Sequence, residues 1–352
     1  MDETFTPLDA ALPRIIDWYA AVRRDLPWRR SPTPYTVWIS EIMLQQTRIE
    51  AVIPYYERFL RELPDVAALA AVEEDRLLKL WEGLGYYSRA RNLKKAALAV
   101  MADFGGQLPR TAAALKTLPG IGDYTAGAIA SIAFGEPEPA VDGNVLRVLT
   151  RLLACDADIA DPRTRARFAG ALRARYPGGE AAALLTEGLM ELGETLCVPN
   201  GEGRCALCPL GALCAARGAG TVERYPVKSP KPPRRIERRT VLLLRREGKL
   251  ALRRRPESGL LAGLWEFPGA EGWLEEEQAL ALAESWGLRP ESCRPFGEAK
   301  HVFTHVEWHM RGWLLDCAAG GEGLTWAAPE EIRGSYSLPT AFRAFRRRLE
   351  KD

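Results

Sequence analysis

The sequence reads LPGIGDYTA from Leu118 to Ala126, and this stretch joins two segments of helical periodicity. Its two glycines, Gly120 and Gly122, stand at alternate positions just before a helix predicted from Tyr124 to Phe134. Glycines placed in this way leave backbone N–H groups bare at a helix start, which suits an anion such as a phosphate. An ordinary helix–helix turn has the same composition, so the local sequence leaves both interpretations open.

Helical periodicity extends on both sides of this hairpin, from about Leu12 to Leu213. Apolar residues recur there at three- and four-residue spacing. Examples are Leu77, Leu78, Leu80, Trp81 and Leu84, and later Val145, Leu146, Leu149, Leu152 and Leu153. Proline and glycine pairs interrupt the pattern, and no comparable stretch alternates at period two. The sequence therefore predicts an all-α domain over residues 1–225.

A cluster of cysteines follows the last predicted helix of this domain. Four of the seven cysteines of the chain fall close together, at Cys197, Cys205, Cys208 and Cys214. Four thiolates suit either tetrahedral zinc or a cubane iron–sulfur cluster. The spacing predicts a metal-binding loop over residues 197–214 and does not by itself choose the metal.

Two carboxylates, Glu41 and Asp142, each stand at a predicted helix start. Glu41 follows Ser40 and opens a helix predicted over residues 41–46, and Asp142 precedes a helix predicted from Val145. Helix capping is one interpretation of both acids. The other pairs them across a pocket, where one protonates a leaving group and the other stabilises an oxocarbenium-like sugar. The helix dipole would lower the pKa of Glu41, so a general acid there needs apolar surroundings that raise it.

The composition changes sharply after Tyr225. The segment YPVKSPKPPRRIERRT, residues 225–240, holds four prolines and six basic residues against one acid. Such a composition favours an extended, solvated linker, which we place at residues 226–239. The segments beyond it predict a small α+β domain over residues 240–352. Strands are expected at 240–244 and 249–252, and helices at 275–286 and 341–349.

The charge of the whole chain is nearly balanced. Its 352 residues carry 48 Lys and Arg and 46 Asp and Glu, a net charge of +2, which does not by itself indicate nucleic acid. A hydrophobic content of 47% excludes a disordered chain. No run of about 20 apolar residues is present, so we expect no membrane span and a cytoplasmic location.

All three histidines of the chain lie near its end, at His301, His305 and His309. The segment from His301 to Met310 alternates as a single strand would. Residues four apart on a strand are separated by about 13 Å, which is too far for one ion. We therefore expect no metal at these histidines.

Five motifs in this order resemble the adenine DNA glycosylases of the MutY type, which are helix-hairpin-helix enzymes related to endonuclease III. They are WISEIMLQQT (38–47), WEGLGYYSR (81–89), the hairpin LPGIGDYTA (118–126), VDGNV (141–145) and the four-cysteine loop. The resemblance is dense over about residues 12–216 and looser beyond them.

The resemblance implies hydrolysis of adenine from mispairs with 8-oxoguanine or guanine in double-stranded DNA. Glu41 matches the acid that protonates adenine, and Asp142 matches the carboxylate that stabilises the sugar cation. Tyr124 and Asn144 stand beside them. Residues matching the adenine pocket are Trp28, Arg29 and Glu187, and residues matching those that fill or flank the duplex are Gln46, Thr47, Leu84 and Tyr86.

The resemblance also implies a [4Fe-4S] cluster in the cysteine loop. Seven residues separate Cys197 from Cys205, where the family usually has six, and the extra one falls within residues 200–203. Tyr124 occupies the position at which endonuclease III-like enzymes carry a lysine nucleophile, so we expect a monofunctional glycosylase. Two alternatives remain: an endonuclease III-like glycosylase/lyase for oxidised pyrimidines, and a non-catalytic mispair-binding protein.

The second domain resembles a Nudix fold whose catalytic helix is incomplete. Gly269 and Glu275 are separated by five residues, as are the glycine and the first glutamate of the Nudix motif. However, Ala283 replaces the arginine of the motif, and Gly287-Leu288 replace its pair of glutamates. Without those acids the domain lacks Mg²⁺ ligands. The resemblance therefore implies recognition of 8-oxoguanine, with Phe303, Thr304 and His305 matching the Phe-Ser-His hairpin that reads the oxidised base. We expect a monomer, in a bacterial cytoplasm, associated with the nucleoid.

Overall fold

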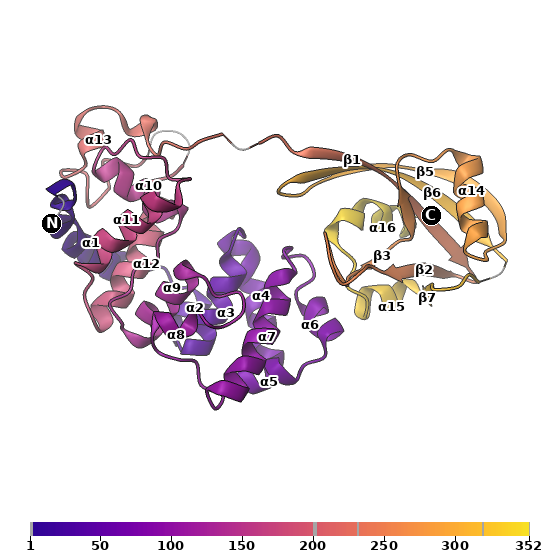
Figure 1. The fold of residues 1–352 in the computed structure, drawn as a ribbon, viewed down its shortest axis with the longest axis horizontal. Helices are drawn as coiled ribbons and strands as arrows, with labels where there is room; N and C mark the ends of the chain where they lie inside the picture. The colour runs from indigo at the N-terminus through magenta and orange to yellow at the C-terminus, as the bar shows by residue number, and fades with distance from the viewer. Residues whose placement is uncertain (1–2, 200–202, 231, 319, 352) are drawn as a thin grey trace. The chain divides into compact units, whose positions relative to one another are not determined.

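The computed structural model describes residues 3–199, 203–230, 232–318 and 320–351. The extra residue expected within 200–203 therefore lies outside the described residues, apart from Gly203. The chain packs as two compact units that are discontinuous in sequence (Figure 1). The first unit is Met1–Ala71 with Asn92–Pro230, and the second is Val72–Arg91 with Lys231–Asp352.

Among its described residues the first unit contains helices and no strand, as the sequence predicts. Its helices are α1 (Pro7–Val22), α2 (Pro27–Arg30), α3 (Pro34–Leu44), α4 (Ile49–Glu62), α5 (Val66–Ala71), most of α7 (Ser88–Asp103), α8 (Ala112–Leu115), α9 (Asp123–Phe134), α10 (Gly143–Leu152), α11 (Pro162–Arg173), α12 (Glu180–Thr195) and α13 (Ala215–Gly218), with the 3-10 turns η1 (Glu3–Phe5) and η2 (Val222–Arg224). In the part of the chain described, no helix is long and apolar enough to cross a membrane.

Helix α12 is the centre of the first unit, because it packs against α1, α9 and α10. Its buried leucines, such as Leu189, join a core with Ile15 of α1 and Leu149 of α10. The close crossing of α1 needs Gly188, since a Cβ at this position would lie 2.9 Å from Ile15 Cγ2. Because α1, α9 and α10 all pack against α12, side chains of these three helices lie close to the polar face of α12.

The predicted helix start at Glu41 is wrong, because α3 begins seven residues earlier at Pro34. Thr33 is its N-cap and accepts a hydrogen bond from the backbone N–H of Thr36 at 3.2 Å. Ser40 does not cap the helix; its hydroxyl donates to Val37 O at 2.9 Å within the helix. Glu41 therefore lies near the C-terminal end of α3, where the helix dipole raises a carboxyl pKa instead of lowering it.

The second unit is built on a mixed sheet with strand order β3-β2-β1-β6-β5, in which β4 also pairs with β1 and β7 with β2. The strands are β1 (Arg235–Arg246), β2 (Lys249–Arg254), β3 (Trp265–Glu266), β4 (Gly269–Glu271), β5 (Pro290–Val302), β6 (Val306–Cys317) and β7 (Thr325–Ala327). Strands β1 and β6 are parallel, whereas β5 and β6 form a long antiparallel hairpin. This confirms the expected α+β class of the second domain.

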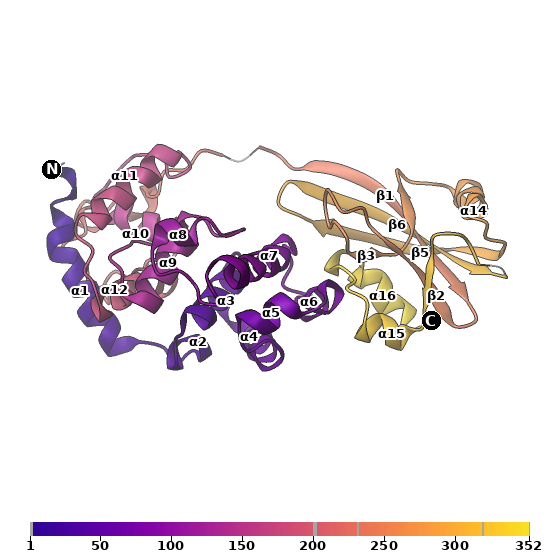
Figure 2. The same ribbon diagram turned by 60° about the horizontal axis from the view of Figure 1, so that its bottom comes forward.

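Helices cover both faces of this sheet (Figure 2). Val241 and Leu243 of β1 face a core shared with α15 (Pro329–Gly334), η3 (Thr340–Phe342) and α16 (Arg343–Leu349). The alternate residues Leu242 and Leu244 face α14 (Glu276–Ser285). A strand buried on both faces is apolar at every position, which explains the run of buried residues in this part of β1.

Two sequence predictions in this region are corrected by the structure. Residues 235–239 are not linker but the first part of β1, where they pair in register with β6. The single strand expected from His301 to Met310 is instead two strands joined by a turn at residues 303–305. The predicted distance of about 13 Å between histidines four apart therefore does not apply, since His301 lies opposite Trp308 across the hairpin.

A short segment from the helical half of the sequence packs with the second unit. This segment, Val72–Arg91, includes α6 (Glu74–Leu80). The Lys79 ammonium group donates to the backbone oxygens of Ile332 at 3.2 Å and Tyr336 at 3.0 Å, and it pairs with Glu82 at 2.5 Å. All three donors of this ammonium group are thus satisfied by oxygens of the second unit.

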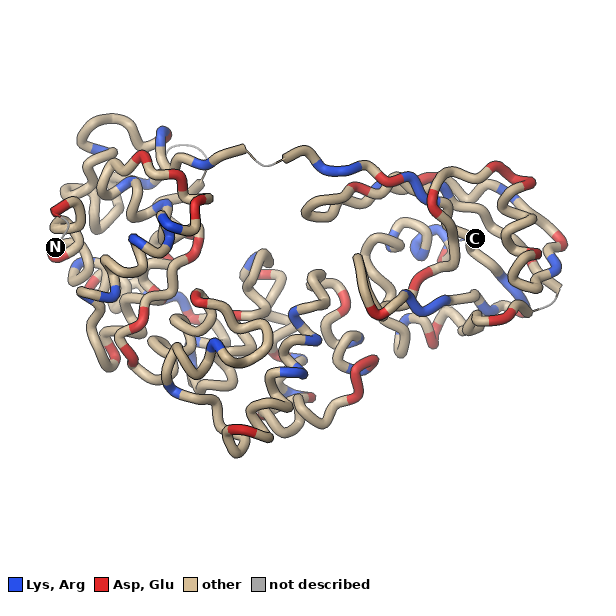
Figure 3. Tube along the Cα trace, viewed as in Figure 1, with Lys and Arg blue, Asp and Glu red and all other residues tan. Residues whose placement is uncertain are grey.

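Charges of both signs are interspersed along both units (Figure 3). The basic segment at residues 226–239 is an exception in the sequence, yet the arginines of its part in β1 also have partners: Arg239 lies over the Trp308 ring at 4.4 Å and Arg238 over the Trp273 ring at 4.7 Å. These arginines stabilise β1 as well as adding positive charge.

Candidate active site

Glu41 is a buried acid on α3, with only 6% of the residue exposed. The Tyr124 hydroxyl, from α9, donates to Glu41 Oε2 at 2.8 Å. Burial raises the pKa of Glu41 from 4.5 to about 7, with smaller contributions from the negative charges of Glu187 and Asp142, while the Tyr124 hydrogen bond and the Arg29 charge lower it. A carboxyl with this pKa holds a proton at neutral pH that it can give to a leaving group.

Asp142 is the N-cap of α10, which confirms the capping prediction for this acid. Its Oδ1 accepts the Val145 N–H at 2.8 Å and its Oδ2 accepts the Asn144 amide at 2.9 Å. Burial raises the pKa of Asp142, whereas the hydrogen bonds from residues 144 and 145 and the Arg147 charge lower it. The two acids therefore have different surroundings: Glu41 accepts one hydrogen bond from a tyrosine, and Asp142 is fixed by backbone and amide donors.

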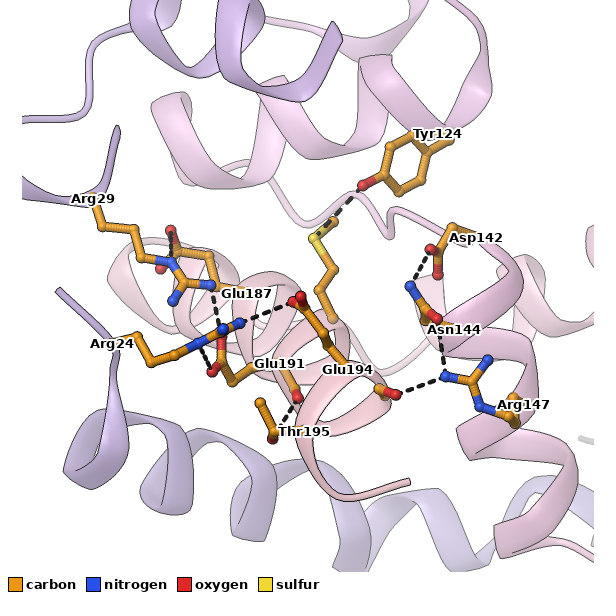
Figure 4. A network of polar contacts seen from close by, with 12 residues as sticks. Arg24, Arg29, Tyr124, Asp142, Asn144, Arg147, Glu187, Glu191, Glu194 and Thr195 are labelled. Atoms are coloured by element: carbon orange, nitrogen blue, oxygen red, sulfur yellow. Dashed lines mark hydrogen bonds and ion pairs between the residues drawn. The ribbon is translucent and has the colours of Figure 1, made fainter. Parts of the chain in front are cut away.

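Arg147 connects the Asp142 side of this site to the end of α12 and the start of the cysteine loop. Its guanidinium group donates to Asn144 Oδ1 at 2.9 Å, to Gly193 O at 2.6 Å and to Cys197 O at 2.7 Å. The residue is buried, with 6% exposed. Figure 4 shows this chain of contacts from Asp142 through Asn144 to Arg147.

The other side of the site is a network of arginines and glutamates around α12 (Figure 4). Glu187 accepts from the Tyr19 hydroxyl at 3.0 Å and pairs with Arg23 at 3.1 Å and with Arg29 at 3.7 Å. Arg29 also donates to Glu191 at 2.9 Å. The structure therefore brings two residues predicted for the adenine pocket, Arg29 and Glu187, into one ionic network. The third, Trp28, is buried against Tyr56 at a ring distance of 5.4 Å.

The predicted phosphate hairpin forms the turn before α9. Gly122 is the N-cap of α9 and provides no side-chain cap, so the first turn of the helix is open to an external anion. Gly120 has a φ of +78°, and a Cβ there would lie 2.6 Å from Asn92 Cβ. Both glycines are exposed, as a phosphate contact requires.

The residues predicted to flank the mismatch fall in both units. Gln46 and Thr47 follow α3 in the first unit, and Gln46 has a left-handed φ of 57°. Leu84 and Tyr86 belong to the second unit, where Tyr86 is 46% exposed and Leu84 is buried with 7% exposed. Tyr86 also has a left-handed φ, of 48°, and is followed by Arg89, whose guanidinium carbon lies 5.5 Å from the Tyr86 ring centroid.

Phe303, Thr304 and His305 form the tip of the β5–β6 hairpin. The Phe303 ring packs edge-on against Trp308 at 4.9 Å, while Thr304 and His305 are exposed. The Thr304 hydroxyl is hydrogen bonded to the Tyr86 hydroxyl at 2.9 Å. Two of the residues predicted to contact DNA are thus in direct contact within the second unit.

The four cysteines of the loop line one cavity with apolar walls, which include Leu192, Leu196 and Leu210. Cys197 Sγ accepts a hydrogen bond from Arg151 at 3.3 Å, and the Cys214 thiol donates to Arg151 O at 3.3 Å. Burial and mutual repulsion raise the pKa of Cys208 to about 11. Thiols gathered in this way need a positive centre to bind as thiolates. Among the described residues, no group of three or more His, Cys, Asp or Glu side chains is close enough together to hold a metal ion.

Comparisons with known proteins agree with both domains. A family model for the HhH-GPD superfamily of base excision DNA repair proteins matches residues 39–173, and a NUDIX domain model matches residues 240–348. Adenine DNA glycosylase of Homo sapiens is 36% identical over 94% of this chain and 73% of its own length. The chain belongs to the adenine DNA glycosylase family. The Arabidopsis thaliana member of this family is 37% identical over 83% of the chain and 55% of its own length.

Solved structures place this adenine DNA glycosylase family member among related repair enzymes. A thermostable thymine-DNA glycosylase aligns with 62% of the chain and all of its own length, at a TM-score of 0.55 and 27% identity. Endonuclease III trapped as a covalent DNA intermediate aligns with 61% of the chain and 97% of its own length, at a TM-score of 0.52 and 25% identity. The chain is therefore a base-excision DNA glycosylase, and its resemblance to this superfamily is confirmed.

Sequence reasoning missed several members of the ionic network, above all Arg24, Arg147 and Glu191. A signal for the glutamate is present, because Glu187, Glu191 and Glu194 recur at helical spacing within an otherwise apolar helix. Acids at buried helical positions need cationic partners. The sequence does not say which arginines these are, since Arg24, between α1 and α2, and Arg29, in α2, lie far from α12 along the chain.

Proposed function

We propose that this glycosylase releases adenine mispaired with 8-oxoguanine, and less efficiently with guanine, from double-stranded DNA. The observation that carries the proposal is that the site holds both a buried Glu41, whose pKa burial raises to about 7, and an Asp142 carboxylate anchored by hydrogen bonds. The curated relatives named adenine DNA glycosylases, which match most of this chain, support the choice of base.

In the proposed reaction the adenine is first extruded from the duplex, because the glycosidic bond is out of reach inside the stack. Glu41 gives its proton to the base, at N7 as the family resemblance implies. The bond between C1′ and N9 then breaks, and its electron pair leaves with adenine. The Asp142 carboxylate faces the oxocarbenium-like sugar, while Asn144 holds its orientation. Glu41, now ionised, takes a proton from the water that adds to C1′.

The reaction is proposed to stop at the abasic site. A lyase needs an amine nucleophile, and Tyr124 stands where a lysine would be required. The nearest lysine, Lys116, is exposed and paired with Asp123 at 2.6 Å. Borohydride treatment should therefore trap no stoichiometric protein–DNA adduct, and such an adduct would instead favour the endonuclease III-like alternative.

Recognition of the opposite base is assigned to the second unit and to the end of α3. Thr304 and His305 at the hairpin tip, with Tyr86, supply exposed hydroxyl, imidazole and aromatic groups. Gln46 and Thr47 supply amide and hydroxyl groups from the first unit. The Nudix-like domain is proposed to bind rather than hydrolyse, because α14 ends at Ser285 and the residues in place of the acidic pair are Gly287 and the buried Leu288.

A [4Fe-4S] cluster is proposed for the cysteine cavity, with Cys197, Cys205, Cys208 and Cys214 as ligands. When bound, such a cluster supplies thiolate–iron bonds that join the ends of this loop. Arg147 and Arg151 bind the loop backbone and would hold it next to α10. The purified protein should absorb at about 400 nm if the metal is iron–sulfur and should be colourless if it is zinc.

We propose an organisation into a glycosylase domain at residues 1–225, a linker from 226 and a recognition domain up to residue 352. The protein is proposed to act as a monomer on chromosomal DNA, in a bacterial cell at the nucleoid. Because residues 72–91 pack with the second unit, we propose that they act together with the recognition domain.

The decisive experiment measures adenine release under single-turnover conditions from a duplex containing one A:8-oxoguanine pair, with A:G and A:T duplexes beside it. We expect rapid release from the first, slower release from the second and none from the third. The Glu41→Gln variant should bind the first duplex without releasing base. Equal release by wild type and variant would refute the mechanism, and tight binding by wild type without release would favour a non-catalytic mispair-binding protein.

A further inference from the structure

Helix α12 presents three glutamates, Glu187, Glu191 and Glu194, on one face at spacings of four and three residues. They differ sharply in exposure. The side chains of Glu187 and Glu191 are 7% and 3% exposed, whereas that of Glu194 is 44% exposed. The family resemblance assigns Glu187 to the adenine pocket, whereas Glu191, the most buried of the three, has no role in the proposed mechanism.

Both carboxylate oxygens of Glu191 are bound by arginines (Figure 4). Arg24 contacts Oε1 through Nε and donates to Oε2 from Nη2 at 3.0 Å, and Arg29 donates to Oε2 at 2.9 Å. Removing a carboxylate from water is costly unless charge-assisted hydrogen bonds replace its hydration. These contacts satisfy Glu191 and at the same time fix the two arginines that make them.

Arg29 is held more closely by Glu191 than by Glu187. Its contact with Glu191 is 2.9 Å, whereas its contact with Glu187 is 3.7 Å. Its guanidinium carbon also lies 5.3 Å from the centroid of the Tyr19 ring. The Arg29 side chain is 9% exposed, so its charge is not dispersed by solvent. The location of this buried positive charge is therefore fixed chiefly by Glu191.

We propose that Glu191 is a positioning residue for base release, which holds Arg29 beside Glu187 and limits the positive charge that reaches Glu41. The inference rests on the proposed function, in which Glu41 is the acid. Glu191 would then be a third carboxylate that affects the reaction, after Glu41 and Asp142. It contacts neither adenine nor the sugar and acts through Arg29.

Four charged or titratable groups face Glu41 from the elements packed around it. They are Tyr124 of α9, Asp142 at the start of α10, Glu187 of α12 and Arg29 of α2. Arg29 lowers the pKa of Glu41, and the two acids raise it. If Glu191 were neutral, the charge of Arg29 would be balanced less completely, and Glu41 would lose its proton at lower pH.

The test is the pH dependence of single-turnover adenine release from an A:8-oxoguanine duplex at saturating enzyme. The Glu191→Gln variant should move the alkaline limb of the profile to lower pH by about 0.5–1 unit, which makes release at pH 8 about 3–10-fold slower than in wild type at the same pH. The matched control is Glu194→Gln, which removes the exposed partner of the same Arg24. Its limb should move by less than about 0.2 unit, because an exposed pair is screened by water.

The Arg24→Met variant tests the same network with the opposite sign. It removes a positive charge and leaves Glu191 to balance Arg29 alone, so the alkaline limb should move to higher pH. A general loss of stability would slow release at every pH and would not move the limb in opposite directions in the two variants. If Glu191→Gln does not fold, the direction in which Arg24→Met moves the alkaline limb of the pH profile tests the proposal by itself.

The proposal is overturned if the limb of Glu191→Gln moves no further than that of Glu194→Gln, or if Arg24→Met moves it downward or not at all. This failure is distinct from failure of the proposed function. In the latter case wild type would not release adenine, or Glu41→Gln would release it as fast as wild type, whatever the Glu191 variants do.

Discussion

Glu41 shows how burial and one hydrogen bond act against each other on a single carboxyl group. Burial stabilises the neutral acid, and the Tyr124 hydroxyl, 2.8 Å away, stabilises the carboxylate. The resulting pKa of about 7 keeps the acid half protonated under neutral conditions. A change at Tyr124 should therefore alter the pH profile without removing the acid itself.

We expect Tyr124→Phe to raise the pKa of Glu41 and to move the alkaline limb of adenine release upward, by about half a pH unit. The sign follows because Glu41 is proposed to act when protonated, and loss of the hydroxyl removes a donor to its ionised form. Profiles of single-turnover rate against pH will show the shift. Tyr35→Phe is the control, since its buried hydroxyl donates to Leu63 O instead. A downward shift in Tyr124→Phe would contradict this account of Glu41.

The same group makes stability depend on pH. Because the pKa of Glu41 is raised from 4.5 to about 7 on folding, the folded state binds more protons than the unfolded state between these values. Its contribution is fully present below about pH 4.5 and is lost as pH rises through about 7. Glutamine at position 41 has no such dependence.

We therefore expect the melting temperature of Glu41→Gln, relative to wild type, to increase between pH 5 and pH 8. Thermal unfolding of both proteins across this range measures the difference directly. Glu194→Gln, at an exposed position of α12, should show no such trend. A constant difference between Glu41→Gln and wild type would mean that Glu41 ionises at the same pH in both states.

At the scale of elements, α10 and α12 are joined by Arg147. Its donors satisfy the last carbonyl groups of one helix and the side chain that orients Asp142 on the other. We expect Arg147→Met to lower the free energy of unfolding by about 3 kcal/mol, because one buried and two partly buried acceptors lose their partner. It should also slow adenine release, since Asn144 is no longer held.

Urea unfolding measures the first effect. The control is Arg173→Met, which removes an exposed pair with Glu138 and should cost less than about 1 kcal/mol. Equal midpoints for the two variants would show that Arg147 has no special part in joining the helices.

The sequence predicted elements best where local signals are strong. The hairpin is an example, because Gly120 and Gly122 mark a turn that the structure confirms before α9. The start of α3 was predicted wrongly, since Ser40 before Glu41 looks like a cap, while the true cap is Thr33 followed by Pro34. The turn at residues 303–305 contains no glycine or proline, so nothing in its composition separates the two strands.

The remaining features that the sequence did not predict depend on contacts between segments that are distant in sequence. Arg235 and Ile236 stand in a polar, proline-rich context and become strand only because β6 pairs with them in parallel. The acids Glu41 and Asp142 could be selected as a pair from the sequence. Of the arginines around α12, only Arg29 was selected; Arg23 and Arg24 were not, because the packing of segments distant in sequence decides which of many arginines meet the glutamates.

At the scale of the whole molecule, the basic segment at residues 226–239, part of which is strand β1, is less available to DNA than its sequence indicates. Arg238 and Arg239 cover tryptophan rings of the second unit, so neutralising them would damage that unit as well as weaken binding. Lys228 and Arg234 are exposed and are better probes. We expect the double variant Lys228→Gln, Arg234→Gln to reduce the slope of log Kd against log salt by about 1–2.

The matched control for this titration is Arg163→Gln, Arg173→Gln, which removes two exposed charges from α11. It should leave the slope within about 0.3 of wild type if α11 does not touch phosphate. An unchanged slope in the linker variant would show that the linker acts only as a spacer.

The division into units also predicts which part of the helical half depends on the second unit. In the full chain Lys79 is enclosed by Glu82 and by the carbonyl groups of Ile332 and Tyr336, so trypsin has little access to it. A fragment of residues 1–230 lacks both carbonyl groups. We expect trypsin to cut this fragment after Lys79 at least about 10-fold faster than it cuts the full chain, because local opening controls cleavage.

Two positions in the same digest serve as internal controls. Arg163, whose side chain is 92% exposed, should be cut equally in fragment and full chain, and the buried Arg151 should stay protected in both if the helical unit remains folded. Cleavage after Lys79 at the same rate in both proteins, with Arg151 still protected, would mean that residues 72–91 are held by the first unit alone. The expected difference would instead place Tyr86, which is proposed to contact the mispair, on a segment whose order depends on the second unit. Removing this unit would then disturb the proposed mispair contact as well as the proposed reading of 8-oxoguanine.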